Sequence, residues 1–131
     1  MRKLFLFVTI LLCLILSACG GETAQGDVFM YEQITAETAK QIMDSGEEHI
    51  ILDVREQEEF DAGHIPGAIL LPYTEIEAKA ETTLPDKDQL ILVYCRSGRR
   101  SKIAAEALVN LGYTNVKEFG GIIDWPYEVV K

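Results

Sequence analysis

Apolar and polar residues alternate in blocks along the chain, and the blocks predict strands and helices in turn. The runs Ile50 to Val54 and Leu90 to Tyr94 are typical of strands that are buried on both faces. After the second run, apolar residues recur at helical spacing between Lys102 and Gly112, and a glycine suits a helix end. Further strands are expected over 29–34, 68–71 and 116–119, and further helices after Thr35, over 56–62 and over 74–81. This alternation predicts an α/β fold with one parallel five-stranded sheet and helices on both of its faces.

The second apolar run leads directly into a cysteine and a short basic loop, Cys95-Arg96-Ser97-Gly98-Arg99-Arg100-Ser101. A helix start carries unpaired N–H groups and a partial positive charge, and both favour an anion. Because three arginines add full charges, we expect the Cys95 thiolate to be favoured over the thiol and an anionic substrate to be held against it. Neither histidine is close to Cys95 in the sequence, so activation by the local field is a simpler hypothesis than a histidine base. The alternative is a structural cysteine that packs as a small hydrophobic residue.

Motifs upstream and downstream of this loop give the pattern a name. They are Asp53-Val54-Arg55, Glu59-Phe60, Gly63-His64-Ile65-Pro66-Gly67-Ala68 and a Gly120-Gly121 pair followed by Trp125. In this order, and together with the loop at Cys95, they resemble the single-domain rhodanese-like (sulfurtransferase) family from about Tyr31 to the C-terminus.

The resemblance implies transfer of sulfane sulfur from a donor such as thiosulfate to cyanide or a thiol, through a persulfide on Cys95 and without a metal or organic cofactor. It assigns substrate binding to the loop and structural support to upstream residues. Asp53 is expected to bond loop amides, Arg55 to pair with an acid such as Glu59, and His64 to brace loops by hydrogen bonds. The substrate-binding residues are then Arg96, Ser97, Gly98, Arg99, Arg100 and Ser101.

Two other functions remain open. Cysteine phosphatases and arsenate reductases also place a cysteine in an anion-binding loop, but their loops typically read Cys-x5-Arg, and here Ser101 stands six residues after Cys95. A sulfur carrier or interaction module without turnover would use the same fold to deliver sulfur to one partner or merely to bind it.

The first residues are typical of a bacterial lipoprotein signal peptide. Arg2 and Lys3 precede an apolar run from Leu4 to Leu16, which is short for a membrane span of about 17–25 residues. Leu16-Ser17-Ala18-Cys19 resembles the lipobox, in which the cysteine is diacylated and becomes the mature N-terminus. We therefore expect a signal peptide over 1–18, a lipidated flexible tether over 19–28, a rhodanese-like domain over 29–131, and a lipid-anchored protein on the extracytoplasmic face, at the outer surface or in the periplasm. A plain transmembrane anchor is the alternative.

Charge and cysteine usage limit the ligands and the disulfide bonds to be expected. Lys and Arg number 12 against 21 Asp and Glu, a net charge of −9, which does not suit binding to nucleic acid. Of three cysteines, Cys13 would leave with the signal peptide and Cys19 would carry lipid, so Cys95 would have no disulfide partner in the chain. The cysteines show no spacing typical of a zinc site. A single small domain with one tail is expected to be a monomer.

Overall fold

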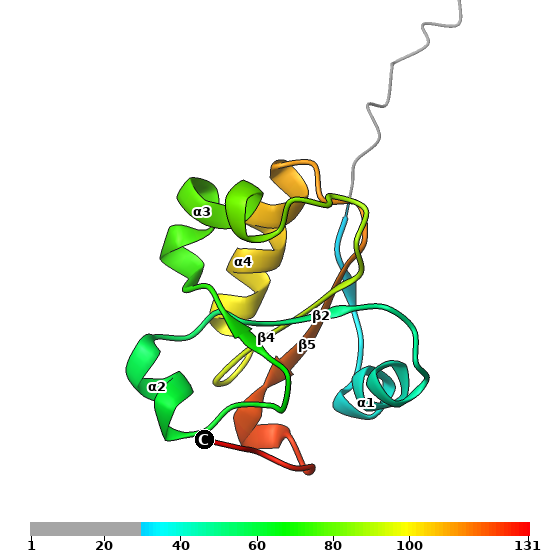
Figure 1. Ribbon diagram of the computed structural model, residues 1–131, viewed down its shortest axis with the longest axis vertical. Coiled ribbons are helices and arrows are strands. Elements are labelled where there is room, and N and C mark those ends of the chain that lie inside the picture. The colour runs from blue at the N-terminus through cyan, green and yellow to red at the C-terminus, as the bar shows by residue number, and fades with distance from the viewer. Residues whose placement is uncertain (1–29) are drawn as a thin grey trace, which may run out of the picture.

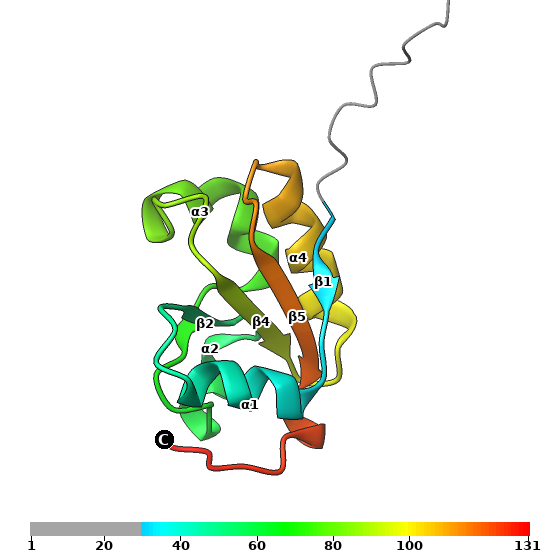
Figure 2. The ribbon, with the colours of Figure 1, turned by 90° about the vertical axis from the view of Figure 1, so that its right-hand side faces the viewer.

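The structure, a computed structural model, describes residues 30–131. Its core is one five-stranded sheet in which every neighbouring pair of strands is parallel and the strand order is β1-β5-β4-β2-β3. This confirms the predicted α/β class (Figures 1 and 2). The strands are β1 (Glu32–Gln33), β2 (Ile50–Asp53), β3 (Ile69–Leu70), β4 (Ile91–Cys95) and β5 (Val116–Gly121).

Helices cover both faces of the sheet, as predicted. Figure 2 shows α1 (Ala36–Asp44) in front of the strands, with α3 (Ile76–Thr83) and α4 (Arg99–Asn110) behind them. The short α2 (Gln57–Ala62) and two 3₁₀ turns, η1 (Tyr73–Glu75) and η2 (Ile122–Asp124), complete the described elements. None of the helices within residues 30–131 is long and apolar enough to span a bilayer.

The central strand β4 supplies both layers of the core. Ile91, Val93 and Cys95 pack in the layer that contains α3 and α4. Leu92 and Tyr94 pack in the other layer, together with Ala39 of α1. Since successive side chains of a strand point to opposite faces, a continuous apolar run is what a strand with helices on both sides requires.

Element ends differ from the predictions by a few residues. Thr35 caps α1 as expected, because its Oγ1 accepts a hydrogen bond from the Thr38 amide at 3.1 Å. The helix predicted over 74–81 is instead the 3₁₀ turn η1 followed by α3, and the last strand continues to Gly121. The predicted signal peptide, Cys19 and the tether lie outside the described residues.

Candidate active site

Cys95 is the last residue of β4, and α4 begins four residues later at Arg99. The residue is 1% exposed, and it lies at the carboxyl end of the central strand, where open α/β sheets bind their ligands. Gly98 is the residue before α4 and has a φ of +103°, in the left-handed region that favours glycine. The predicted arrangement of strand, tight loop and helix is therefore present.

The sulfur of Cys95 forms hydrogen bonds with its own loop. The Gly98 amide donates to Sγ at 3.0 Å, and the thiol donates to the Ser101 hydroxyl oxygen at 3.4 Å. Burial alone would raise the pKa of the thiol, but once the sulfur is ionised the Ser101 hydroxyl and the amides of Ser101, Gly98 and Ser97 can donate to it. These hydrogen bonds outweigh burial, so the pKa of Cys95 is lowered. The shift has the direction that the sequence predicts for an activated thiol.

The three arginines have different surroundings. Arg96 and Arg99 are exposed, whereas Arg100 is half-buried and binds Glu59 of α2 through two hydrogen bonds, of 2.7 and 2.8 Å. Arg55 pairs with an acid, as expected, but the acid is not Glu59, because Arg100 occupies that carboxylate. The guanidinium of Arg100 lowers the pKa of Glu59 to about 2, and the Glu56 amide adds to this effect.

Arg55 binds Asp53 instead. Its Nε and Nη2 donate to the Asp53 carboxylate, with a shortest distance of 2.7 Å, and Nη2 also donates to the Gly63 carbonyl oxygen at 2.7 Å. Tyr94 Oη donates to the same carboxylate at 2.6 Å, and burial raises the pKa of Tyr94 with the help of this bond. The Asp53 carboxylate also accepts a hydrogen bond from the backbone amide of Arg55 at 3.0 Å. This is the loop amide that it binds, and no hydrogen bond joins it to residues 96–101. The cluster Asp53–Arg55–Tyr94 holds the loop after β2, which is a structural role.

His64 has contacts of the bracing kind expected from the sequence. Its Nδ1 lies 2.9 Å from the Phe60 carbonyl oxygen, and its ring stacks on that of Phe60 with centroids 3.8 Å apart. Its backbone pairs with Val130 through two hydrogen bonds of 2.8 and 2.9 Å. His64 thus joins the end of α2 to the C-terminal segment.

The close approach of the loop after Cys95 to β5 explains why residue 121 of the Gly120-Gly121 pair is glycine. Cys95 is paired with Gly121 across β4 and β5, and a Cβ at Gly121 would overlap the Arg96 carbonyl oxygen. Only glycine lets the loop after Cys95 pass this close to β5.

One residue of the site was not predicted. Glu118 of β5 is 3% exposed, and its Oε1 accepts hydrogen bonds from the Ser101 hydroxyl at 2.7 Å and the Gly120 amide at 2.8 Å. A signal was available, since the period of two in a strand places Glu118 on the same face as the buried Val116. A buried acid requires a hydrogen-bonding partner, and here the partner is Ser101 of the cysteine loop.

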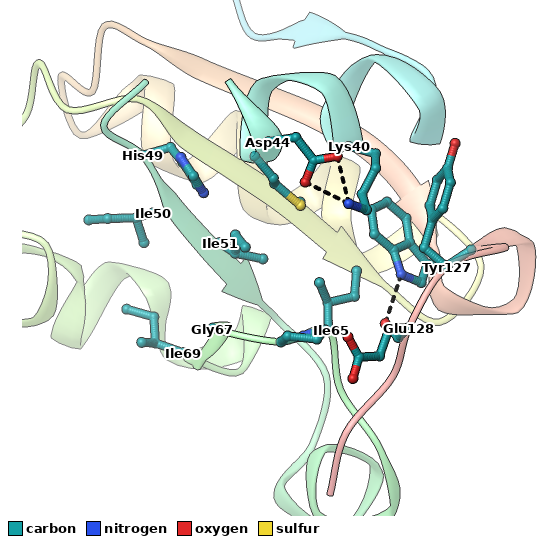
Figure 3. A pocket seen from close by; sticks show the side chains of 13 residues that line it. Lys40, Asp44, His49, Ile50, Ile51, Ile65, Gly67, Ile69, Tyr127 and Glu128 are labelled. Carbon is teal, nitrogen blue, oxygen red and sulfur yellow. Dashed lines mark hydrogen bonds and ion pairs between the residues drawn. The ribbon is translucent and has the colours of Figure 1, made fainter. Parts of the chain in front are cut away.

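A separate pocket of about 590 Å³ lies between α1, β2 and the C-terminal segment. Figure 3 shows Ile51 and Ile65 on one side of it and the Lys40–Asp44 ion pair and Tyr127 on the other. None of residues 95–101 lines it, so it is not part of the cysteine site. Within residues 30–131, no three or more His, Cys, Asp or Glu side chains gather where they could hold a metal ion.

Comparisons with known proteins agree with this geometry. The model of the family described as "Rhodanese-like domain" matches residues 35–126. The thiosulfate sulfurtransferase PspE of Escherichia coli is 42% identical over 80 residues, which are 61% of this chain and 77% of that protein. The Bacillus subtilis protein named "Putative sulfur carrier protein YrkF" is 38% identical over 107 residues, or 81% of this chain, and this chain spans only 57% of its length.

Solved structures include one titled "rhodanese with anions from E. coli". It is 38% identical and has a TM-score of 0.60, over 63% of this chain and 98% of that one. The family model matches most of the described residues, and a thiosulfate sulfurtransferase is among the relatives. This chain therefore belongs to the rhodanese-like domain family.

Proposed function

We propose that this protein is a sulfurtransferase that moves sulfane sulfur from a donor such as thiosulfate to cyanide or a thiol through a persulfide on Cys95. The observation that carries the proposal is the hydrogen bond from the Gly98 amide to the Cys95 sulfur, beside the Ser101 hydroxyl and the start of α4. Such donors stabilise a sulfur anion in the way that an oxyanion hole stabilises developing charge. PspE, the relative named a thiosulfate sulfurtransferase, supports the choice of donor.

The reaction consists of two displacements at sulfur. The Cys95 thiolate attacks the outer sulfur of thiosulfate, the S–S bond breaks, and sulfite leaves with its electron pair. The acceptor then attacks the outer sulfur of the persulfide, and Cys95 departs as the thiolate. With cyanide the product is thiocyanate, and the cycle calls for no metal or organic cofactor.

Side chains around the sulfur divide the remaining tasks. The exposed Arg96 and Arg99 attract the donor dianion and hold its sulfonate end. Arg100 contributes its charge from the first turn of α4 while Glu59 holds its guanidinium in place. Ser97, Gly98 and Ser101 supply the amides that face the sulfur.

Turnover with thiosulfate and cyanide tests the proposal. We expect saturable thiocyanate production by the wild type and one added sulfur on Cys95 in mass spectrometry after exposure to thiosulfate. Cys95→Ala should lower the rate to the uncatalysed background while far-UV circular dichroism stays unchanged. Activity retained in this variant would contradict the assignment, and a persulfide formed once without turnover would favour the carrier function that the name of YrkF suggests.

Separate assays with aryl phosphates and with arsenate test the phosphatase and arsenate reductase alternative. The loop ends in Ser101, where a phosphatase loop would have arginine, and its sulfur is approached by amides rather than by a bidentate guanidinium. We expect no hydrolysis of aryl phosphates and no arsenate reduction. Release of phosphate that depended on Cys95 would replace sulfur transfer as the function.

Membrane anchoring through Cys19 is part of the proposal and rests on the sequence alone. Residues 1–18 would be removed as a signal peptide, the diacylated Cys19 would hold the domain at the extracytoplasmic face, and the domain would act as a monomer. Cys19→Ala should move the protein out of the membrane fraction in fractionated cells or leave it uncleaved. An unchanged distribution would remove the lipobox interpretation.

A further inference from the structure

Glu118 is a buried acid that accepts a hydrogen bond from the Ser101 hydroxyl, and this hydroxyl also lies beside the Cys95 sulfur. It is 3% exposed, Ser101 is fully buried, and the two are 2.7 Å apart. The same hydroxyl oxygen lies 3.4 Å from Cys95 Sγ. Among the described residues, no lysine, arginine or histidine forms an ion pair with Glu118. Its two donors, the Ser101 hydroxyl and the Gly120 amide, are both neutral.

The Ser101 hydroxyl has one proton and several acceptors around it. Glu118 Oε1 is nearest at 2.7 Å, the Gly98 carbonyl oxygen is at 3.0 Å, and the Gly120 carbonyl oxygen and Cys95 Sγ are each at 3.4 Å. The Ser101 hydroxyl donates its hydrogen bond to the Glu118 carboxylate, which is the nearest acceptor, because hydrogen bonds to ionised acceptors are the strongest. The serine oxygen then offers only its lone pairs to the sulfur, and the thiol S–H donates to it.

The order of donors reverses when the thiol ionises. When Cys95 loses its proton, only the S–H bond breaks and nothing is oxidised or reduced, and the Ser101 hydroxyl can turn from Glu118 Oε1 to the sulfur. The hydroxyl then donates to the thiolate, while Glu118 keeps the hydrogen bond from the Gly120 amide.

Other charged groups near Cys95 lie outside this chain of hydrogen bonds. Arg100 of α4 acts on the sulfur through its charge and is paired with Glu59 of α2. Asp53 and Arg55 neutralise each other, and Tyr94, which binds them, packs in the α1 layer rather than in the layer that contains Cys95. On β5, Glu118 is the acid that faces the sulfur side of the sheet.

We propose that Glu118 is a positioning residue: its carboxylate holds the Ser101 hydroxyl away from the sulfur at rest and, as a neighbouring negative charge, sets how readily Cys95 becomes a thiolate. The proposal deepens the proposed function and rests on it for the purpose of the thiolate. Glu118 needs no contact with substrate for this role, because it acts through Ser101.

Alkylation of Cys95 by iodoacetamide as a function of pH tests the proposal without any sulfur donor. In Glu118→Gln the amide keeps the shape of the side chain and can still bond Ser101 and Gly120, but it carries no charge. Because removal of a like charge favours the thiolate, we expect the alkylation midpoint to move to lower pH than in the wild type. Glu106→Gln, which removes an exposed carboxylate from α4, is the matched control and should leave the midpoint unchanged.

A second pair of variants tests the route through Ser101 and serves if Glu118→Gln does not fold. Ser101→Ala removes the donor to the thiolate and should raise the midpoint, and Ser101→Thr, which keeps a hydroxyl, should restore it towards the wild-type value. In the Ser101→Ala background, Glu118→Gln should cause a smaller shift than in the wild type.

Each outcome has a clear meaning. An unchanged midpoint in folded Glu118→Gln, or equal shifts with and without the Ser101 hydroxyl, would overturn the inference. A shifted midpoint in a protein that makes no thiocyanate would instead leave the inference standing and remove the proposed sulfur transfer.

Discussion

Two buried carboxylates flank the central strand, and their partners differ. Asp53 ends β2 on one side of β4, and Glu118 lies in β5 on the other. Asp53 accepts hydrogen bonds from the Arg55 guanidinium and the Tyr94 phenol, whereas Glu118 accepts them from the Ser101 hydroxyl and a backbone amide. Asp53 therefore has a cationic partner, whereas the hydrogen-bond donors of Glu118 are neutral groups, one of which also lies beside the reactive sulfur.

The pleat of β4 explains why the two carboxylates have different hydrogen-bonding partners. Tyr94 and Cys95 are consecutive, so their side chains point to opposite faces of the sheet. Tyr94 reaches Asp53 in the α1 layer, and Cys95 lies in the α4 layer with Ser101 and Glu118. One strand thus separates a structural cluster from a reactive one by a single residue.

The largest expected effect on stability comes from Asp53→Ala. The substitution leaves the guanidinium of Arg55 buried without its partner, which costs about 3–5 kcal/mol of the free energy of unfolding. Urea unfolding followed by circular dichroism measures the loss. Glu118→Gln, which keeps its hydrogen-bonding shape, is the comparison and should lose only about 1 kcal/mol. Equal losses in the two variants would remove the distinction between the clusters.

The next largest effect is expected for Gly121→Ala. A Cβ at this position would overlap the Arg96 carbonyl oxygen, so the loop after Cys95 must move, at a cost of about 1–3 kcal/mol and with loss of sulfur transfer. Gly46→Ala is the matched control, since Gly46 has a φ of +79° but open space around it. It should cost about 1 kcal/mol from backbone strain and leave thiocyanate production unchanged. An active Gly121→Ala variant would show that the loop position is not set by β5.

A third carboxylate, Glu59, gives an intermediate case because its ion pair with Arg100 is partly solvated. The pKa of Glu59 is lowered to about 2, so the pair stabilises the folded state above the unfolded pKa of about 4.3, and this contribution is lost as the pH falls toward 2. Glu59→Gln should therefore cost about 1 kcal/mol at pH 7 and reduce the loss of stability between pH 4.5 and 2. Thermal unfolding across this pH range is the measurement. Glu75→Gln, in the exposed pair with Lys79, is the control and should change little.

The smallest effect on stability is expected for Arg99→Ala. Arg99 is exposed, so its removal should change the free energy of unfolding by less than about 0.5 kcal/mol while it raises the KM for thiosulfate. Lys102→Ala, another exposed cation of α4, controls for net charge. Arg100→Ala should raise the same KM but also lose the stabilisation from Glu59. If the KM values of both arginine variants equal that of the wild type, the arginines have no part in substrate binding.

Local patterns in the sequence were sufficient for the elements and for the loop at Cys95. The apolar run before Cys95 and the helical spacing after it depend on neighbours in the chain, so the strand, the tight turn and the helix could be predicted from them. The partner of Arg55 could not, because Asp53 and Glu59 are both within reach along the chain and only packing decides between them. Arg100 meets Glu59 across 41 residues, and Ser101 meets Glu118 across 17. Such pairs depend on the order of strands in the sheet, and a pattern of apolar residues does not determine that order.

The short antiparallel bridge between His64 and Val130 has a practical consequence for shortened versions of the protein. The family match ends at residue 126, four residues before Val130. Chains trimmed to that boundary would lose both backbone bonds that secure His64. The neighbouring Gly63 carbonyl is an acceptor for Arg55, so the damage would reach the ion pair at the end of β2. Purification tags should therefore follow Lys131 through a spacer, and truncation after residue 126 is expected to yield a less stable protein whose Cys95 is intact.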